Sequence, residues 1–200
     1  MFSIYFQLGF EHISDIKAYD HILFIIALCA IYRPQDWKNI LILVTAFTIG
    51  HSITLALAAF DIIRFPANII EFLIPVTILI TALSNFYQTQ SSIEEKTNLF
   101  HQNKKRNYWL ALFFGWIHGM GFSNYLRELM MPGEEGQLVI QLLAFNLGIE
   151  VGQLLIVAIL FILAFIVLNL FKLPQKWWVR MVSGIIAIWS IRLMIDTFPF

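Results

Sequence analysis

The sequence is poor in charge and in cysteine. Only 13% of its 200 residues are Asp, Glu, Lys or Arg, and 59% are hydrophobic, whereas about a quarter of the residues in a soluble domain are charged. The formal net charge is zero, so no nucleic-acid partner is expected. A single cysteine, Cys29, excludes an intrachain disulfide and a Cys-x-x-Cys metal site. This composition indicates a polytopic membrane protein in a lipid bilayer.

Several common catalytic signatures are also missing. The sequence has no His-Glu-x-x-His, Gly-x-Ser-x-Gly, Walker A or Gly-x-Gly-x-x-Gly motif, which argues against the metalloproteases, hydrolases and nucleotide-binding enzymes that carry them. What the chain has instead is long apolar segments interrupted by single ionisable residues.

Crossing the hydrocarbon core of a bilayer takes about 20 mostly apolar residues. Segments near that length lie at residues 16–33, 37–60, 66–87, 108–124, 138–170 and 179–198. We therefore predict an all-α fold, in which residues 1–200 form one transmembrane domain with about six helices. Residues 88–107 are expected to form a polar cytoplasmic loop.

The distribution of Lys and Arg predicts the orientation. Cationic residues in cytoplasmic connections usually outnumber those outside. The side that holds the first, third and fifth connections carries more of them than the other, which places both termini outside the cytoplasm. The richer set is Arg33, Lys38, Lys96, Lys104, Lys105, Arg106, Lys172, Lys176 and Arg180, and the poorer set is Lys17, Arg64, Arg127 and Arg192.

Ionisable residues inside a membrane are costly and mark functional sites by default. Five of the predicted spans carry ionisable or amide side chains. The spacing of those in the fifth span places them on one helix face. With a rise of about 1.5 Å per residue, all of them fall between the middle and the outer half of the bilayer. We therefore expect them to meet. They are Asp20, His21, His51, Glu71, His118, Asn146, Glu150 and Gln153.

Imidazole and carboxylate ligands suit a divalent transition metal such as nickel, cobalt, zinc or iron better than Cu(I), which prefers sulfur. The predicted metal ligands are Asp20, His21, His51, Glu71, His118 and Glu150, and the less secure ones are His12, Asn146 and Gln153. The simpler interpretation is structural: a histidine or amide can bind a neighbouring helix, and a carboxylate can pair with a cation such as Arg192.

Small residues accompany two of the polar positions. Gly115 and Gly119 flank His118, and Gly148 and Gly152 flank Glu150. Such small-xxx-small pairs predict close helix packing in membranes.

These residues lie in six segments that together resemble the HupE/UreJ family, membrane proteins associated with hydrogenase and urease maturation and regarded as nickel or cobalt permeases. The segments are "GFEHI", "YDHILF", "FTIGHSITLALA", "IEFLIPVTILITAL", "FFGWIHGMGFSNY" and "FNLGIEVGQ". The resemblance implies a six-helix protein of the bacterial inner membrane that handles metal with the predicted ligands, His12 among the less certain ones.

Three functions stay open on the sequence alone. The chain could transport a divalent metal, or it could be an intramembrane metalloenzyme in which a stable three-histidine site acts on a lipid or other membrane-bound substrate. A haem or quinone protein is the third alternative. The identity of the metal, the direction of movement and self-association into a homo-oligomer are also left open.

Overall fold

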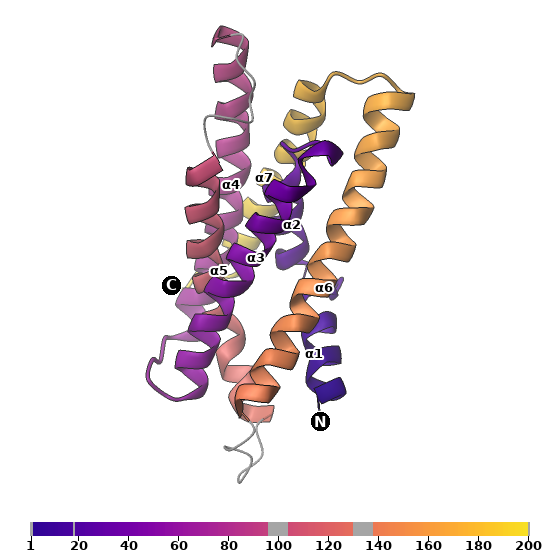
Figure 1. The fold of residues 1–200 in the computed structure, drawn as a ribbon. Coiled ribbons are helices and arrows are strands. Elements are labelled where there is room, and N and C mark those ends of the chain that lie inside the picture. Colours follow the sequence, from indigo (N-terminus) through magenta and orange to yellow (C-terminus); the bar gives the residue numbers. More distant parts are fainter. Residues whose placement is uncertain (1, 18, 96–103, 130–137, 200) are drawn as a thin grey trace.

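All regular structure in the computed structural model is helical within the residues that it describes, 2–17, 19–95, 104–129 and 138–199 (Figure 1). This confirms the predicted all-α class. The long elements run approximately along one axis. They are α1 (Phe2–Ser14), α2 (Asp20–Cys29), α3 (Trp37–Ala59), α4 (Ala67–Glu95), α5 (Lys104–Leu129), α6 (Leu138–Phe165) and α7 (Gln175–Asp196), with short turns η1 (Pro34–Asp36) and η3 (Ile166–Leu170).

Local sequence explains where several helices begin and end. Prolines at positions 34, 66 and 174 stand at helix starts, where the missing N–H is not needed. α3 ends in a Schellman-type turn: the N–H of Ile62 donates to the carbonyl of Leu57, and Asp61 takes a left-handed conformation with φ of 58°. This conformation closes the free carbonyls of the last helical turn.

The helices pack most extensively in three pairs, α3 with α5, α1 with α6, and α4 with α7. Glycines allow two of these pairs to approach closely. A Cβ atom on Gly148 of α6 would overlap the carbonyl oxygen of Phe6 in α1, and one on Gly115 of α5 would overlap the carbonyl oxygen of Phe47 in α3. The predicted role of the small residues in close helix packing is therefore confirmed.

The short helix α2 lies at the centre of the bundle. It contacts α1, α4, α6 and α7, and six of its ten residues are buried. α1 and α2 follow one another along the bundle (Figure 1): His12 near the end of α1 lies beside His21 at the start of α2. The break between the two helices therefore brings His12 and His21 together, while its own residues Asp15, Ile16 and Lys17 are exposed.

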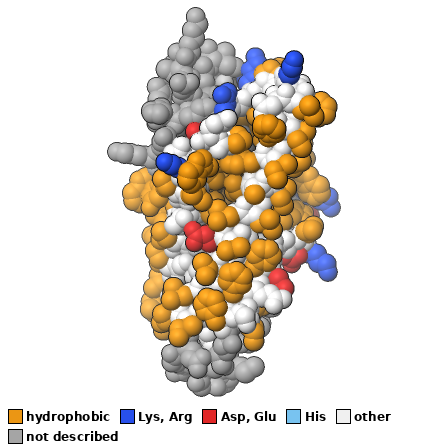
Figure 2. All heavy atoms as spheres, turned by 45° about the vertical axis from the view of Figure 1, so that its right-hand side comes forward, with side chains coloured by type: hydrophobic (Ala, Val, Ile, Leu, Met, Phe, Trp, Pro, Cys, Tyr) orange, Lys and Arg blue, Asp and Glu red, His pale blue; other side chains and the backbone are white. Residues whose placement is uncertain are grey.

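The outer surface is strongly apolar. Figure 2 shows one face of the molecule that is covered largely by hydrophobic side chains. On α6 the exposed ones recur along the whole helix and include Val139, Leu143, Leu147, Leu155, Ile159 and Ile162. An apolar exterior around a partly polar interior is what a bilayer requires.

Four helical segments of the described chain are long and apolar enough to cross a membrane: Pro34–Ala59, Ala67–Thr89, Leu138–Leu170 and Gln175–Asp196. They correspond to four of the predicted spans. The predicted first span, residues 16–33, is not one helix, because α2 covers only Asp20–Cys29, about 15 Å at the usual helical rise. The predicted span at 108–124 lies in α5. The six-span topology and its orientation stay predictions.

Part of the predicted loop at 88–107 is helical instead. α4 continues to Glu95 and α5 begins at Lys104, and Gln88 and Thr89 at the start of this segment are still buried in the bundle. The remainder, residues 96–103, lies outside the described residues.

Candidate metal centre

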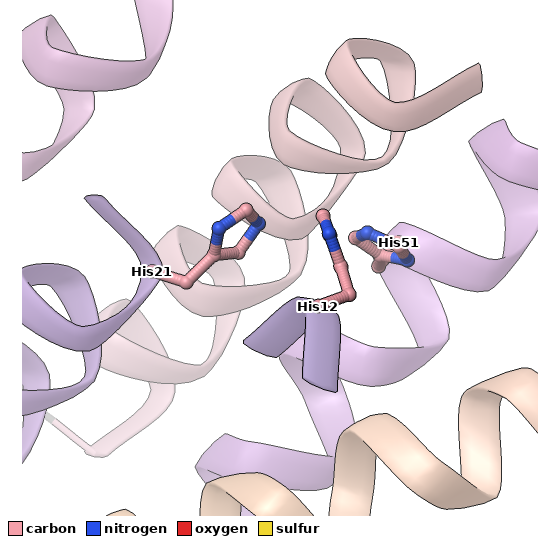
Figure 3. A group of neighbouring side chains, drawn as sticks. All are labelled: His12, His21 and His51. Atoms are coloured by element: carbon pink, nitrogen blue, oxygen red, sulfur yellow. The ribbon is translucent and has the colours of Figure 1, made fainter. Parts of the chain in front are cut away.

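Three histidines from three helices come together inside the bundle. His12 of α1, His21 of α2 and His51 of α3 each offer a ring nitrogen, and these nitrogens all lie within 4.8 Å of one another. Figure 3 shows the three rings gathered, with His12 between the other two. Two nitrogens bound to one tetrahedral ion lie about 3.4 Å apart, so small rotations of the rings are enough for all three to reach one ion.

His118 of α5 adjoins this group. Its ring centroid lies 5.0 Å from that of His21, and the side chain is fully buried. Its Nε2 lies 3.2 Å from the hydroxyl oxygen of Thr77 on α4. The imidazole of His118 therefore lies next to the three-histidine group as a fourth candidate ligand.

Asp20 fixes the orientation of His21. Its Oδ1 lies 3.0 Å from Nδ1 of His21 and also accepts the backbone N–H of that residue. Because a carboxylate only accepts hydrogen bonds, Nδ1 carries the proton and Nε2 keeps its lone pair. Carboxylates commonly orient metal-binding histidines in this way.

Most ring nitrogens of the cluster are buried without a hydrogen-bond partner among the described residues. They are Nε2 of His12, Nε2 of His21, both nitrogens of His51 and Nδ1 of His118. Buried polar atoms are normally satisfied, because leaving them unpaired costs free energy. Several such atoms in one place are the donor set that a metal ion would satisfy together.

Phenylalanine rings enclose the histidines. Phe122 lies 4.0 Å from His12, Phe24 lies 5.1 Å from His118, and Phe145 lies 6.4 Å from His51, centroid to centroid. Aromatic side chains around a site exclude water and lower the local dielectric constant. This strengthens the attraction between a cation and its ligands.

The polar residues of α6 mainly tie this helix to α3. Glu150 accepts a hydrogen bond of 2.8 Å from Thr45, and Gln153 accepts one of 2.8 Å from Thr48. The amide of Asn146 donates to the backbone carbonyl of Leu142. Glu150 does not belong to the group of clustered His, Cys, Asp and Glu side chains found among the described residues. The bonds of Glu150 and Gln153 join two helices, whereas the bond of Asn146 lies within α6.

Glu71 occupies a different position from the one expected. Its side chain is exposed and lines a cavity of about 210 Å³ with Lys17, Asp20 and Pro75. Its carboxylate is thus outside the three-histidine group, but it shares this cavity with the residue that orients His21. Arg192, which was considered as a cationic partner for Glu71 and Glu150, lies 3.8 Å from Asp196 instead.

A second, larger pocket borders the histidine cluster at His12. This pocket of about 710 Å³ is lined by apolar and acidic residues together with His12. His12 therefore lies at the boundary between the opening and the buried histidines. The other lining residues are Leu8, Glu11, Ser14, Asp15, Ile16, Lys17 and Phe122.

His12 was predicted only as a less secure ligand, but it lies within the three-histidine group. The residue precedes the first predicted span, and periodicity alone does not show that α1 enters the bundle. The available signal was Gly9, which lies three residues before His12 and allows α1 to pack against the carbonyl of Phe145 on α6. A small residue facing a partner helix marks a buried helix face.

The comparisons with known proteins identify one family. No curated protein and no solved structure matched the chain. The family model described as HupE / UreJ protein matches residues 1–198, which is nearly the whole chain. Together with the apolar helices, the match indicates an integral membrane protein, and the chain belongs to the HupE/UreJ family.

Proposed function

We propose that the protein transports a divalent transition metal ion, nickel or cobalt in the first place, across the bacterial inner membrane. The ion binds transiently to His12, His21, His51 and His118, and Asp20 orients His21. Zinc and iron suit the same donors. Glu71 and Glu150 remain predicted ligands of the metal ion during its transport. Asn146 and Gln153 remain predicted hydrogen-bonding groups beside these ligands.

The observation that carries this proposal is the set of buried ring nitrogens on four separate helices that have no hydrogen-bond partner in the part of the chain that the structure describes. A histidine that only joins two helices uses its nitrogens for hydrogen bonds. Both nitrogens of His51 lack such a bond among the described residues. A divalent ion offsets the free energy of burying these groups, because each lone pair gains a bond.

The position of the histidine cluster fits a transport path for the ion better than a closed, structural metal site. The break between α1 and α2 leaves a pocket that reaches His12, and the next histidines lie deeper in the bundle. Broken helices commonly form binding sites at mid-membrane in transporters, because the interrupted backbone lines a cavity.

Uptake of radioactive nickel, cobalt and zinc into proteoliposomes tests the proposal. The wild-type protein should accumulate at least one of these ions, and His51→Ala should abolish uptake because the variant loses a fully buried ligand. Lys38→Ala, at an exposed position on α3, is the control and should transport normally. A wild-type protein that moves none of the divalent ions contradicts the proposal.

The pocket beside His12 supports a second candidate, an intramembrane metalloenzyme. Its volume of about 710 Å³ lies within the range of sites for small organic ligands. Such an enzyme requires a metal that is retained in stoichiometric amounts after purification and dialysis. A transporter binds the same ion weakly enough to release it. Elemental analysis before and after dialysis therefore separates the two functions.

A further inference from the structure

A line of buried polar side chains continues from the histidine cluster along α4. Thr77, Thr81 and Asn85 are spaced four residues apart and so lie on one helix face, and Gln88 follows one turn later. All four side chains are at most 7% exposed. The line begins at the metal centre, because the hydroxyl oxygen of Thr77 lies 3.2 Å from Nε2 of His118. We call these four residues the α4 polar stripe.

Neighbouring helices add polar groups to the stripe. The amide of Asn85 donates to the hydroxyl of Ser183 on α7 at 3.2 Å. A small cavity beside Asn85 is lined by Thr81 and Gln88 and by Asn107 of α5. Its volume of about 10 Å³ is at the lower limit for one water molecule.

The end of α2 points toward the same place. The amide of Asn85 donates to the carbonyl of Ala27 at 2.7 Å, and α2 ends two residues later, at Cys29. The last carbonyls of a helix carry partial negative charge, which attracts cations. The C-terminal ends of interrupted helices coordinate cations in transporters by this means.

We propose that the α4 polar stripe is the inner half of the metal path, along which hydroxyl and amide oxygens replace part of the hydration shell of a divalent cation after it leaves His118. This inference rests on the proposed transport function. From Thr77 to Gln88 the stripe covers about 16 Å at the helical rise, and it runs toward the side of the predicted cytoplasmic connections. Oxygen groups that bind weakly at successive positions allow an ion to leave.

The alternative is that these residues only hold α2, α4 and α7 together. Uptake and metal binding respond differently under the two explanations. A residue of the path affects the rate of uptake and leaves equilibrium binding at the histidines intact. A residue that only supports the bundle affects both or neither.

The test measures nickel or cobalt uptake in proteoliposomes and equilibrium binding of the same ion in detergent. Thr81→Val and Asn85→Leu should each lower the uptake rate by about tenfold or more, since a desolvated cation loses a ligand. Binding affinity should stay within about twofold of wild type, because the histidines are unchanged. Ser190→Ala should leave both unchanged. Like Thr81, Ser190 is a buried residue whose hydroxyl donates to a carbonyl four residues earlier in its own helix.

A cysteine variant gives an independent measurement. In a Cys29→Ala background, Thr81→Cys places a thiol on the path, so uptake should become sensitive to Cd²⁺, which thiolates bind strongly. Ser190→Cys in the same background should not respond. Normal uptake in Thr81→Val and Asn85→Leu, or a parallel loss of uptake and binding, overturns the stripe as a path. A wild-type protein without uptake overturns the proposed transport function as well.

Discussion

Asp20 and His21 form a pair in which one residue orients the other: Oδ1 of the carboxylate lies 3.0 Å from Nδ1 of the imidazole. The pair stands at the start of α2, directly after the break in the N-terminal helices. This pairing leaves Nε2 of His21 available to coordinate a metal ion. The charged carboxylate at the edge of an apolar run thus serves the histidine that follows it.

Replacing Asp20 by Asn should weaken metal binding about tenfold to hundredfold, because residues that orient a ligand contribute by that factor. The protein should still bind metal, since all four histidines remain. Isothermal titration with Ni²⁺ or Co²⁺ in detergent measures the change. Asp196→Asn removes an exposed carboxylate and serves as the control. Equal affinities for Asp20→Asn and wild type show that the carboxylate does not support the site.

Replacing His12, His21 or His51 by Ala should each lower metal occupancy by a large and similar factor. One ion shared by three ligands is lost when any of them is removed. A double variant should lose little more than a single one, because the same ion cannot be lost twice. Elemental analysis at limiting metal concentration measures occupancy, with Lys38→Ala as the control. Full occupancy in His51→Ala beside complete loss in His21→Ala would show two separate features instead of one site.

The sequence predicts the helical class and draws attention to His21, His51 and His118, because ionisable residues in apolar segments have few interpretations. It does not predict the break between α1 and α2. The segment at 16–33 has the length of a span, and only the packing of α1 against α6 shows that the chain enters the bundle earlier. For this reason His12 was only one of the less secure ligands in the prediction.

Glu71 shows that the depth of a residue along a helix does not fix the direction of its side chain. A depth estimate places it at the level of the histidines, but depth says nothing about the direction in which a helix face points. α4 turns Glu71 to an exposed position and turns Thr77 to His118. Hydroxyl groups such as that of Thr77 carry little signal in a sequence, since they commonly bond their own helix. Thr77 and Thr81 were not singled out from the sequence for this reason.

Replacing Glu150 by Gln should have a milder effect on metal binding than removing a histidine. The carboxylate accepts a hydrogen bond from Thr45, and an amide oxygen can accept the same bond. Direct titration of Glu150→Gln beside His51→Ala measures the difference. A loss as large as that of His51→Ala identifies Glu150 as a ligand in the loaded protein.

Replacing Gly148 by Ala should destabilise the protein because α1 and α6 lie too close at this point for a methyl group. The added Cβ would overlap the carbonyl oxygen of Phe6, and forced separation of packed helices costs about 1–3 kcal/mol. Since α1 carries His12, metal affinity should fall together with thermal stability. Gly184→Ala on α7 is the matched control, because its Cβ would lie 3.7 Å from the ring of Phe86, an ordinary contact. Thermal unfolding in detergent with and without Ni²⁺ measures both effects. Equal melting temperatures for the two variants contradict the close packing of α1 against α6.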